Sequence, residues 1–412
     1  MPKAKDKLIF ITHYLGSLRY FEKLIPYLTS KYEVVFLFMP QVHKDFKTEM
    51  IAYCQRKNYP YIAMKPFGDK KIGHFLPFLN PLSELANLKR ETKKVLTDAT
   101  IKKIVSVFDG GLYNYFLKNG QQQNIETFVL QWAATNRQEL TERKIQPKIH
   151  QVGLYLFLVY HLRMFLLKTS LRTSFLGGGS SEKLGAINKY SANFFKEAGV
   201  PESKVSIVGY IDFDLAREMK KNIIQNPSLK QQLALKNKVD LNKKNILLYS
   251  TLFHKKDIKI FSLQDQLNYY QKIIEIIRQV FPAQTVDILF KIHPAGYASL
   301  YESLKKYGVK VFGKDAENDE LIALSDLYIA HHTTTNFMAI LMGIPCIFIN
   351  LLKMPTIEQT KINFGIKYFI QDEKTLKKRL IDFENNQLER QYDFDPKIFP
   401  ENCIQKIINW IN

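Results

Sequence analysis

The chain has 412 residues, and its 59 lysine and arginine residues outnumber its 39 aspartate and glutamate residues, which gives a formal charge of +20. Apolar residues make up 46% of the chain and charged residues 24%, a balance that excludes wholesale disorder and collagen-like or low-complexity architectures. At roughly 150 residues per domain, this length predicts two or three domains, each able to bury its own core.

The first half of the chain alternates apolar strands with helices. Lys7–Thr12 predicts a short buried strand, and Leu18–Leu28 has apolar residues at helical spacing. Further strands are predicted at Tyr32–Met39, Tyr61–Met64, Ile101–Phe108, Glu126–Gln131, Lys183–Asn188 and Lys204–Gly209, and helices at Asp45–Lys57, Leu82–Ala99 and Lys189–Ala198. This alternation indicates a parallel sheet covered on both faces, so we predict one Rossmann-like domain over residues 1–215.

The same pattern restarts after residues 216–244, a polar stretch rich in Lys, Asn and Gln that predicts an interdomain connection with a helix in it. Strands are predicted at Asn245–Thr251, Asp287–Ile292, Val309–Phe312, Leu327–Ala330 and Pro345–Asn350, and helices at Leu263–Val280, Glu320–Ser325 and Asn336–Met342. Residues 245–412 therefore predict a second doubly wound domain. The terminal helix 403–411 could pack on either domain.

Cysteine usage and hydropathy bear on the compartment. Cys54, Cys346 and Cys403 lie far apart without metal-ligand spacing, which argues against a disulfide framework or a zinc site and favours a reducing compartment. The most apolar stretch, Val152–Leu167, is shorter than the roughly 18–20 residues of a membrane span and contains His161. We expect a cytoplasmic protein with no secretion signal and no membrane span.

Ligands of open parallel sheets bind beyond the carboxyl ends of the strands, where helix N-termini offer unpaired N–H groups. Polar side chains lie at many of these points: His13, Ser17, Asp109, Gln131, His254, Lys255, His293 and the run His331–Asn336. Thr251 and Lys291, within the last residues of their predicted strands, are further candidates for donor binding. If the two sheets oppose each other, these side chains face one cleft. We predict an active site in a cleft between the two domains.

The run from His331 to Asn336 places three hydroxyls and an amide between a strand end and a helix N-terminus. This combination offers helix caps and anion-binding donors together, so it predicts a phosphate site that includes Thr333, Thr334 and Thr335. The alternative is that these threonines only cap the helix. His332 and Asn336 are candidates for the same site.

Two further groups are candidates for acid and base chemistry. His293, with Pro294 after it and Lys291 before it, could donate a hydrogen bond or a proton to a leaving phosphate. Asp109 precedes two glycines and could deprotonate an acceptor hydroxyl, although a turn aspartate bonded to its own backbone is equally consistent with the sequence. The glycine-rich segment Gly177–Ser181 lacks the ending of a phosphate loop and predicts a mobile loop.

Two Rossmann-like domains, a Lys-x-His-Pro strand end at 291–294 and a threonine-rich run before Ala339-x-x-x-Gly343-x-Pro345 resemble the GT-B glycosyltransferases. The resemblance is to the branch that contains CDP-glycerol glycerophosphotransferases and bacterial sialyltransferases and polysialyltransferases. The non-hydrolysing UDP-N-acetylglucosamine 2-epimerases are similar at greater distance. The resemblance implies the GT-B fold, two Rossmann-like domains that face each other across a cleft.

The resemblance also implies residue roles. Asp109-Gly110 resembles the motif whose carboxylate is the sialyltransferases' base, but Phe108 stands where the motif has a first acid. His293-Pro294 and the three threonines match the motifs that contact the donor phosphate. Gln131 matches the first residue of a Gln-His-Gly motif that Trp132 does not continue, and Met338 occupies the position of a ribose-binding glutamate in many GT-B enzymes.

The implied activity is inverting, metal-independent transfer of a sugar from a nucleotide-activated donor, with a cytidine donor such as CMP-sialic acid favoured and no cofactor or metal required. The acceptor implied is a cell-envelope or capsular polysaccharide. A CDP-glycerol or polyol glycerophosphotransferase and an enzyme similar to the UDP-N-acetylglucosamine 2-epimerases are the alternatives.

The positive charge bears on the acceptor. Between Arg137 and Arg172, seven cations, Lys144 and Lys148 among them, accompany two acids around the most apolar stretch. This pattern suits an anionic glycan or lipid-linked acceptor, or the anionic cytoplasmic face of the inner membrane, although a buried helix with a basic rim is the alternative. Nucleic acid is disfavoured as a partner, because the cations are spread over many helices and no nucleic-acid motif is present.

Overall fold

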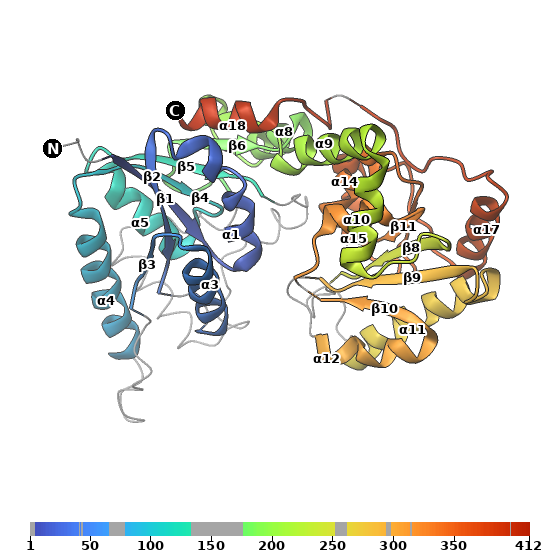
Figure 1. Cartoon of the computed structure of the whole chain (residues 1–412). Coiled ribbons are helices and arrows are strands. Elements are labelled where there is room, and N and C mark those ends of the chain that lie inside the picture. The colour runs from blue at the N-terminus through green and yellow to red at the C-terminus, as the bar shows by residue number, and fades with distance from the viewer. Residues whose placement is uncertain are drawn as a thin grey trace, which may run out of the picture. The chain divides into compact units, whose positions relative to one another are not determined.

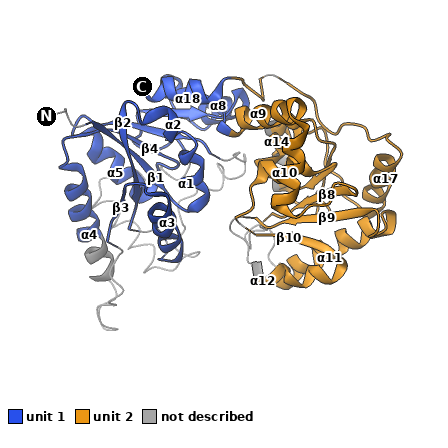
Figure 2. Ribbon diagram, in the orientation of Figure 1, with its two compact units in different colours: residues 1–133, 137–211, 402–412 blue, residues 134–136, 212–401 orange. Residues whose placement is uncertain are grey.

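The computed structural model describes residues 5–40, 42, 44–65, 79–132, 176–251, 262–293, 298–313, 315–395 and 397–412. Over these residues the chain forms two compact units (Figure 2). Unit 1 takes in the described residues up to Ile211 together with the C-terminal segment 402–412, and unit 2 comprises residues 212–401.

Unit 1 is built on a parallel sheet of seven strands (Figure 1). Its first strand in the chain, β1 (Asp6–Thr12), lies inside the sheet and pairs with β2 on one side and β4 on the other. The strands follow the order β3 (Tyr61–Ala63), β2 (Tyr32–Phe38), β1, β4 (Ile101–Ser106), β5 (Glu126–Leu130), β6 (Lys183–Ala186) and β7 (Val205–Ile207). The strand order reverses between β1 and β4, which makes their carboxyl ends the topological switch point.

The helices of unit 1 cover this sheet because their apolar faces match the apolar runs of the strands. Phe21 on α1, for example, stacks on Phe10 of β1 with 4.3 Å between ring centroids. The helices are α1 (Leu15–Glu22), α2 (Ile25–Leu28), α3 (Lys44–Lys57), α4 (Leu79–Leu96), α5 (Gly111–Gln121) and α8 (Lys189–Glu197). The single helix predicted over Leu18–Leu28 is wrong: two helices form, and Pro26, which lacks an N–H, lies in the first turn of the second.

The terminal helix α18 (Cys403–Ile411), which the sequence assigned to neither domain, belongs to unit 1. The ring of Trp410 lies 5.0 Å from that of Phe128 on β5 in an edge-on contact. Gly209 has a φ of +89°, and a Cβ there would lie 2.2 Å from the Cys403 sulfur, so only glycine allows this approach. The chain therefore returns to its first unit at the C-terminus.

Unit 2 repeats the same topology with a parallel sheet of five strands. The order is β10 (Val309–Phe312), β9 (Val286–Lys291), β8 (Lys244–Tyr249), β11 (Leu327–Ala330) and β12 (Cys346–Phe348). Its switch point is between β8 and β11. The main helices are α9 (Ile211–Gln225), α10 (Pro227–Asn237), α11 (Leu263–Val280), α13 (Asn318–Leu324), α14 (Thr335–Met342) and α17 (Glu373–Glu384), with short helices α12 (Ala298–Tyr301), α15 (Pro355–Gln359) and α16 (Lys361–Phe364).

Both faces of the second sheet are buried. On one face Ile246, Leu248, Ile288 and Phe290 join the apolar side of α11 in a single core cluster. On the other, Tyr249 contacts Asn318 of α13 and Tyr328 contacts the first turn of α14. Alternate residues of each strand thus pack on opposite layers, as expected for a doubly wound sheet.

The predicted α/β class with two Rossmann-like domains is confirmed by these two parallel sheets. Residues 216–244, interpreted as an interdomain connection, form most of α9, all of α10 and the start of β8, and they belong to unit 2. Among the described residues, no helix combines the length and the apolar character that crossing a bilayer requires. The predicted cleft between the domains stays a prediction.

Candidate functional site

The turn between β11 and α14 lies at the switch point of unit 2. Helix α14 begins at Thr335 with Thr334 as its N-cap, and the amide of Asn336 donates to the Thr333 carbonyl at 3.0 Å. Neither Thr333 nor Thr334 is buried, whereas all eight residues of α14 are. The helix N-terminus therefore presents its positive end at a turn with two half-buried threonines, and the Thr333 hydroxyl lies 3.2 Å from Thr335 Oγ1.

Buried polar groups fix this turn from behind. The Tyr328 hydroxyl, in the core of β11, lies 2.7 Å from Thr335 Oγ1 and donates to Asn336 Oδ1 at 3.0 Å. The side-chain amide of Asn336 in turn donates to the His331 carbonyl at 2.7 Å. Thr335 and Asn336, both predicted as donor-binding residues, are thus engaged inside the protein, and they hold the backbone on which Thr333 and Thr334 are displayed.

His331 links this turn to helix α11. Its Nε2 lies 2.6 Å from the hydroxyl of Tyr269 on α11, and only 1% of the residue is exposed. Burial, with a smaller contribution from His332, lowers the pKa of His331 to about 3, so the ring is neutral at physiological pH. His331 is a structural group of the site, while its half-buried neighbour His332 lies nearer the surface.

The ends of β8 and β9 are tied together beside this turn. The His293 backbone amide donates to Ser250 Oγ at 2.7 Å, and the Ser250 amide donates to the Lys291 carbonyl at 2.9 Å. Thr251 is anchored by its backbone, which donates to the Tyr270 hydroxyl at 2.7 Å. These bonds fix the backbone from which the half-buried side chain of His293 projects.

Lys291, predicted to bind the donor, is 1% exposed. Its ammonium donates to the Gly313 carbonyl at 2.6 Å and thereby links the end of β9 to the residue after β10. This contact assigns it a structural role at the sheet edge.

In unit 1, Asp109 follows β4 at the switch point but is completely buried. Its carboxylate accepts hydrogen bonds from the backbone amides of Gly177 and Gly179 at 2.9 and 3.0 Å and from the Ser181 hydroxyl at 2.8 Å. The Lys204 ammonium lies 3.6 Å from the same carboxylate. These partners use the lone pairs that a general base would need.

Lys204 completes this arrangement from the other side of the same loop. Its ammonium donates to the carbonyls of Gly177 and Gly179, each at 2.8 Å, and burial lowers its pKa while Asp109 acts in the opposite direction. A Cβ on Gly179 would lie 1.9 Å from the Asp109 carbonyl oxygen. The segment Gly177–Ser181, interpreted from sequence as a mobile loop, is instead held in place by hydrogen bonds to Asp109 and Lys204.

The other predicted residues of unit 1 divide into one exposed group and two buried ones. His13 is exposed after β1, and its Nδ1 lies 2.6 Å from the Tyr113 hydroxyl. Ser17 is fully buried and its Oγ accepts from the His13 amide at 3.0 Å, which closes the start of α1. Gln131 is also fully buried and its Oε1 accepts from the Ile187 amide at 2.9 Å.

Five predicted residues, Lys144, Lys148, His254, Lys255 and Pro294, lie outside the described residues. Of the rest, the structure brings Thr251, His293 and the 331–336 turn to one edge of the unit 2 sheet, and His13, Ser17, Asp109 and Gln131 to the corresponding edge of unit 1. Within the described part of the chain, no three His, Cys, Asp or Glu side chains are grouped as metal ligands would be.

Sequence reasoning missed the groups that support the two edges, namely Ser250, Tyr269, Tyr328 and Lys204. Ser250 was detectable, because it directly precedes Thr251 at the end of a predicted strand. The tyrosines were not, since a tyrosine among apolar residues of a helix or strand looks like an ordinary core residue.

Neither the protein families nor the curated proteins compared with this sequence include a match. Solved structures do match over nearly the whole chain. UDP-GlcNAc 2-epimerase from Neisseria meningitidis, solved with UDP-GlcNAc, aligns with a TM-score of 0.60 at 13% identity and covers 98% of both chains. The enzyme of the same name from Methanocaldococcus jannaschii gives a TM-score of 0.55 at 13% identity, again covering 98% of both chains.

The wall teichoic acid polymerase TagF, solved as an H444N variant with CDPG, aligns with a TM-score of 0.57 at 12% identity and covers 98% of this chain and 88% of its own. Identities this low establish the fold and nothing finer. The chain has a GT-B type fold with two Rossmann-like domains.

Proposed function

We propose that this protein is a metal-independent, inverting glycosyltransferase that uses a nucleotide-activated donor. The observation that carries the proposal is the turn at the N-terminus of α14. At the switch point of unit 2, the half-buried residues Thr333 and Thr334 lie on a turn that hydrogen bonds of Tyr328, Asn336 and His331 hold in place. Such a preorganised helix N-terminus suits the phosphate of a nucleotide.

In the proposed reaction the acceptor hydroxyl attacks the anomeric carbon in line with the leaving phosphate. The new carbon–oxygen bond forms as the bond to the phosphate oxygen breaks, and the negative charge passes to the nucleotide. The α14 N-terminus, Thr333 and Thr334 stabilise that charge, and His293 donates a hydrogen bond or a proton to it. Fixed dipoles then supply the stabilisation that a metal ion supplies in other enzymes.

The donor proposed first is CMP-sialic acid or a similar cytidine nucleotide, on the strength of the motif resemblance. A glycerophosphotransferase acting on a CDP-linked polyol is the second candidate, and the fold shared with TagF, solved with CDPG, supports it. An activity like that of the UDP-N-acetylglucosamine 2-epimerases is the third candidate.

The contacts of Asp109 change the residue that we propose as the base. Asp109 was the predicted base, but its carboxylate is buried and bonded to the 177–181 loop, which supports a positioning role instead. His13 lies at the adjacent strand end with an exposed ring oriented by Tyr113. Partial desolvation lowers the pKa of His13 below 6.5, so the ring is neutral at pH 7 and can accept a proton.

We retain an anionic glycan or lipid-linked acceptor, and a cytoplasmic location at an anionic membrane surface, as parts of the proposal. Their support is the basic sequence around Lys144 and Lys148, which lies outside the described residues.

A thermal-shift screen of CMP, CDP, UDP and GDP tests the nucleotide site. We expect one nucleotide to raise the melting temperature of the wild type, and His293→Ala and Thr334→Ala to reduce both this shift and transfer at least tenfold. Thr29→Ala is the matched control, because it changes a threonine at the C-terminal end of α2 in unit 1. If His293→Ala and Thr334→Ala keep transfer within a few-fold of the wild-type rate, the assignment fails.

A pH profile tests the base. With His13 as base, kcat/KM rises with pH through the histidine pKa below 6.5 and then levels. His13→Gln should lower the plateau by 10²- to 10⁴-fold and remove this limb, while nucleotide binding stays unchanged. If the rise of kcat/KM with pH persists in His13→Gln, another group is the base.

A further inference from the structure

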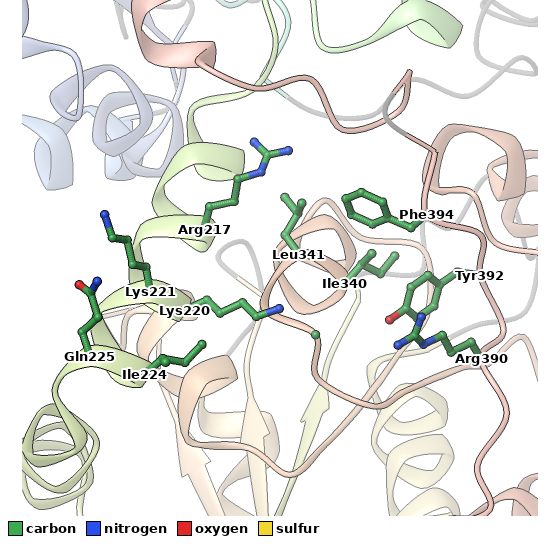
Figure 3. A pocket seen from close by; sticks show the side chains of 11 residues that line it. Arg217, Lys220, Lys221, Ile224, Gln225, Ile340, Leu341, Arg390, Tyr392 and Phe394 are labelled. Atoms are coloured by element: carbon green, nitrogen blue, oxygen red, sulfur yellow. The ribbon is translucent and has the colours of Figure 1, made fainter.

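Unit 2 contains a pocket of about 500 Å³ that the nucleotide proposal does not use. It is formed by α9, the C-terminal end of α14 and the segment 390–394 (Figure 3). Helix α14 has eight residues and is therefore about 12 Å long. The pocket thus lies at the end of α14 opposite to the threonine turn, on the amino-terminal side of the strands.

Cations reach this pocket from two walls. Lys220 extends from α9 toward Gly343, and a Cβ on Gly343 would lie 3.1 Å from the Lys220 ammonium (Figure 3). Arg390 comes from the opposite wall. Among the described residues neither side chain has an ion-pair partner, whereas Arg217 is committed to the carbonyls of Phe399 and Pro400 at 2.8 and 3.0 Å. Lys221 of α9 lines the pocket as well, and Lys220 and Arg390 are two of its cations that remain available to an anion.

The remaining lining is largely apolar, and part of it is exposed. Ile224, one turn after Lys220 on the same face of α9, is 69% exposed, and Phe394 is 55% exposed. The Phe394 ring stacks on the buried ring of Phe399, with 5.0 Å between centroids and an interplanar angle of 3°, so it is held in a fixed orientation. Two exposed apolar side chains, one on each wall, thus flank the cations of this pocket.

We propose that this pocket binds the phosphate headgroup of an anionic lipid, with Ile224 and Phe394 entering the interfacial layer of the bilayer. A phospholipid presents an anion above an apolar body, and the pocket presents cations beside exposed apolar side chains, so the two match in charge and polarity. An anionic glycan fits less well, because it needs hydrogen bonds to its hydroxyls and most uncharged side chains of the lining are apolar. The site is independent of the proposed transferase chemistry.

Tryptophan fluorescence in vesicles of phosphatidylcholine and phosphatidylglycerol tests this site. Phe394→Trp in the full chain places a reporter at the pocket, and lipids with brominated acyl chains quench a tryptophan that enters the bilayer. The wild type, whose tryptophans are Trp132 and Trp410, gives the background. We expect a blue shift and additional quenching for Trp at 394, and neither with vesicles of phosphatidylcholine alone.

Charge removal provides the second arm. Lys220→Gln with Arg390→Gln, in the Phe394→Trp background, should lower vesicle partitioning about 10- to 30-fold at physiological salt, because each cation near an anionic surface is worth about tenfold or less. Lys374→Gln with Lys378→Gln removes the same charge from the exposed side of α17 and should leave partitioning unchanged.

Three results would overturn the proposal. Vesicle-bound protein without additional quenching at position 394 would mean that another surface adsorbs to lipid. Equal partitioning of the Lys220/Arg390 variant and its control would remove the role of the pocket. A fluorescence change at position 394 with inorganic phosphate or a soluble anionic polysaccharide, but none with vesicles, would assign the pocket to a soluble anion.

Discussion

The carboxyl-terminal edges of the two sheets have the same topology but use their polar residues in opposite ways. In unit 1, Asp109 directs both carboxylate oxygens inward to the 177–181 loop, and none of its surface is exposed. In unit 2, the inward contacts belong to Tyr328, Asn336 and His331, and they leave Thr333 and Thr334 at the surface. At the unit 1 edge, Asp109, Ser17 and Gln131 are bonded within the protein and His13 is exposed, whereas the unit 2 edge leaves Thr333 and Thr334 half-buried.

A position after a strand predicts where a side chain lies but not what it does. Asp109 and Thr334 both follow strands at switch points, and sequence treats them alike. The contacts separate them, because an acid with three hydrogen-bond donors and the Lys204 ammonium around it is satisfied within the protein, whereas a half-buried threonine at a helix N-terminus can bind an external anion.

The largest effect that separates the two edges is expected from Asp109→Ala. This change leaves Lys204 buried without its counter-charge and the amides of Gly177 and Gly179 without an acceptor. We expect the free energy of unfolding to fall by about 3–5 kcal/mol, measured by urea denaturation. Nucleotide binding by the protein that remains folded at low temperature should be unchanged.

Glu202→Ala is the matched control, since it removes an acid whose side chain is 80% exposed beside Lys196 on the same unit. Its stability should equal that of the wild type within error. If Asp109→Ala is as stable as this control but inactive in transfer, Asp109 is the base and not a clamp.

A smaller effect, specific to unit 2, is expected from pH. The folded pKa of His331 is about 3 and its ordinary value is 6.5, so below pH 6.5 the unfolded state binds more protons. The contribution of the neutral ring is complete above pH 6.5 and is lost as pH falls toward 3. We expect a slope of up to about 1.4 kcal/mol per pH unit in the wild type and a shallower slope in His331→Gln.

The neighbouring substitution His332→Gln is the control for this slope, because His332 is only half-buried. Chemical denaturation between pH 4 and pH 8 gives the comparison. Equal slopes for His331→Gln and the wild type would mean that His331 does not act as a buried neutral anchor.

The smallest effect is expected from Tyr269→Phe, which removes the hydroxyl 2.6 Å from His331 Nε2 and with it the interaction of that hydroxyl with the Leu351 backbone. We expect a loss of about 0.5–1.5 kcal/mol in stability, together with weaker nucleotide binding because the turn is less firmly held. Tyr368→Phe, at a tyrosine that is 39% exposed, should change neither quantity. A Tyr269→Phe protein with wild-type binding would show that the turn does not depend on this anchor.

Much of the fold follows from the sequence, because apolar strands and amphipathic helices carry their period in the chain. The predicted helix Leu263–Val280 and the predicted strands Val309–Phe312 and Leu327–Ala330 coincide with α11, β10 and β11. The sequence did not distinguish helix α9 from an interdomain connection, because most of its residues are polar. The position of α18 depends on the close approach of Gly209 to Cys403, a contact 194 positions along the chain that no local pattern reveals.

The candidate site is less predictable than the fold. Sequence located the edge of each sheet and selected Thr333, Thr334 and His293, which remain candidates for the donor phosphate. It could not see that Lys291 and Gln131 are buried and bonded within the protein, because burial of a polar side chain depends on distant partners such as Gly313 and Ile187. It also could not pair Asp109 with Lys204, which are far apart in the chain.

The most direct test of the central claim is nucleotide affinity measured by calorimetry on Thr333→Ala with Thr334→Ala. If the turn at the α14 N-terminus binds the donor phosphate, the double variant should bind the preferred nucleotide about 10- to 100-fold more weakly than the wild type, with an unchanged melting temperature in the absence of ligand. An affinity equal to that of the wild type would contradict the assignment of this edge as the donor site.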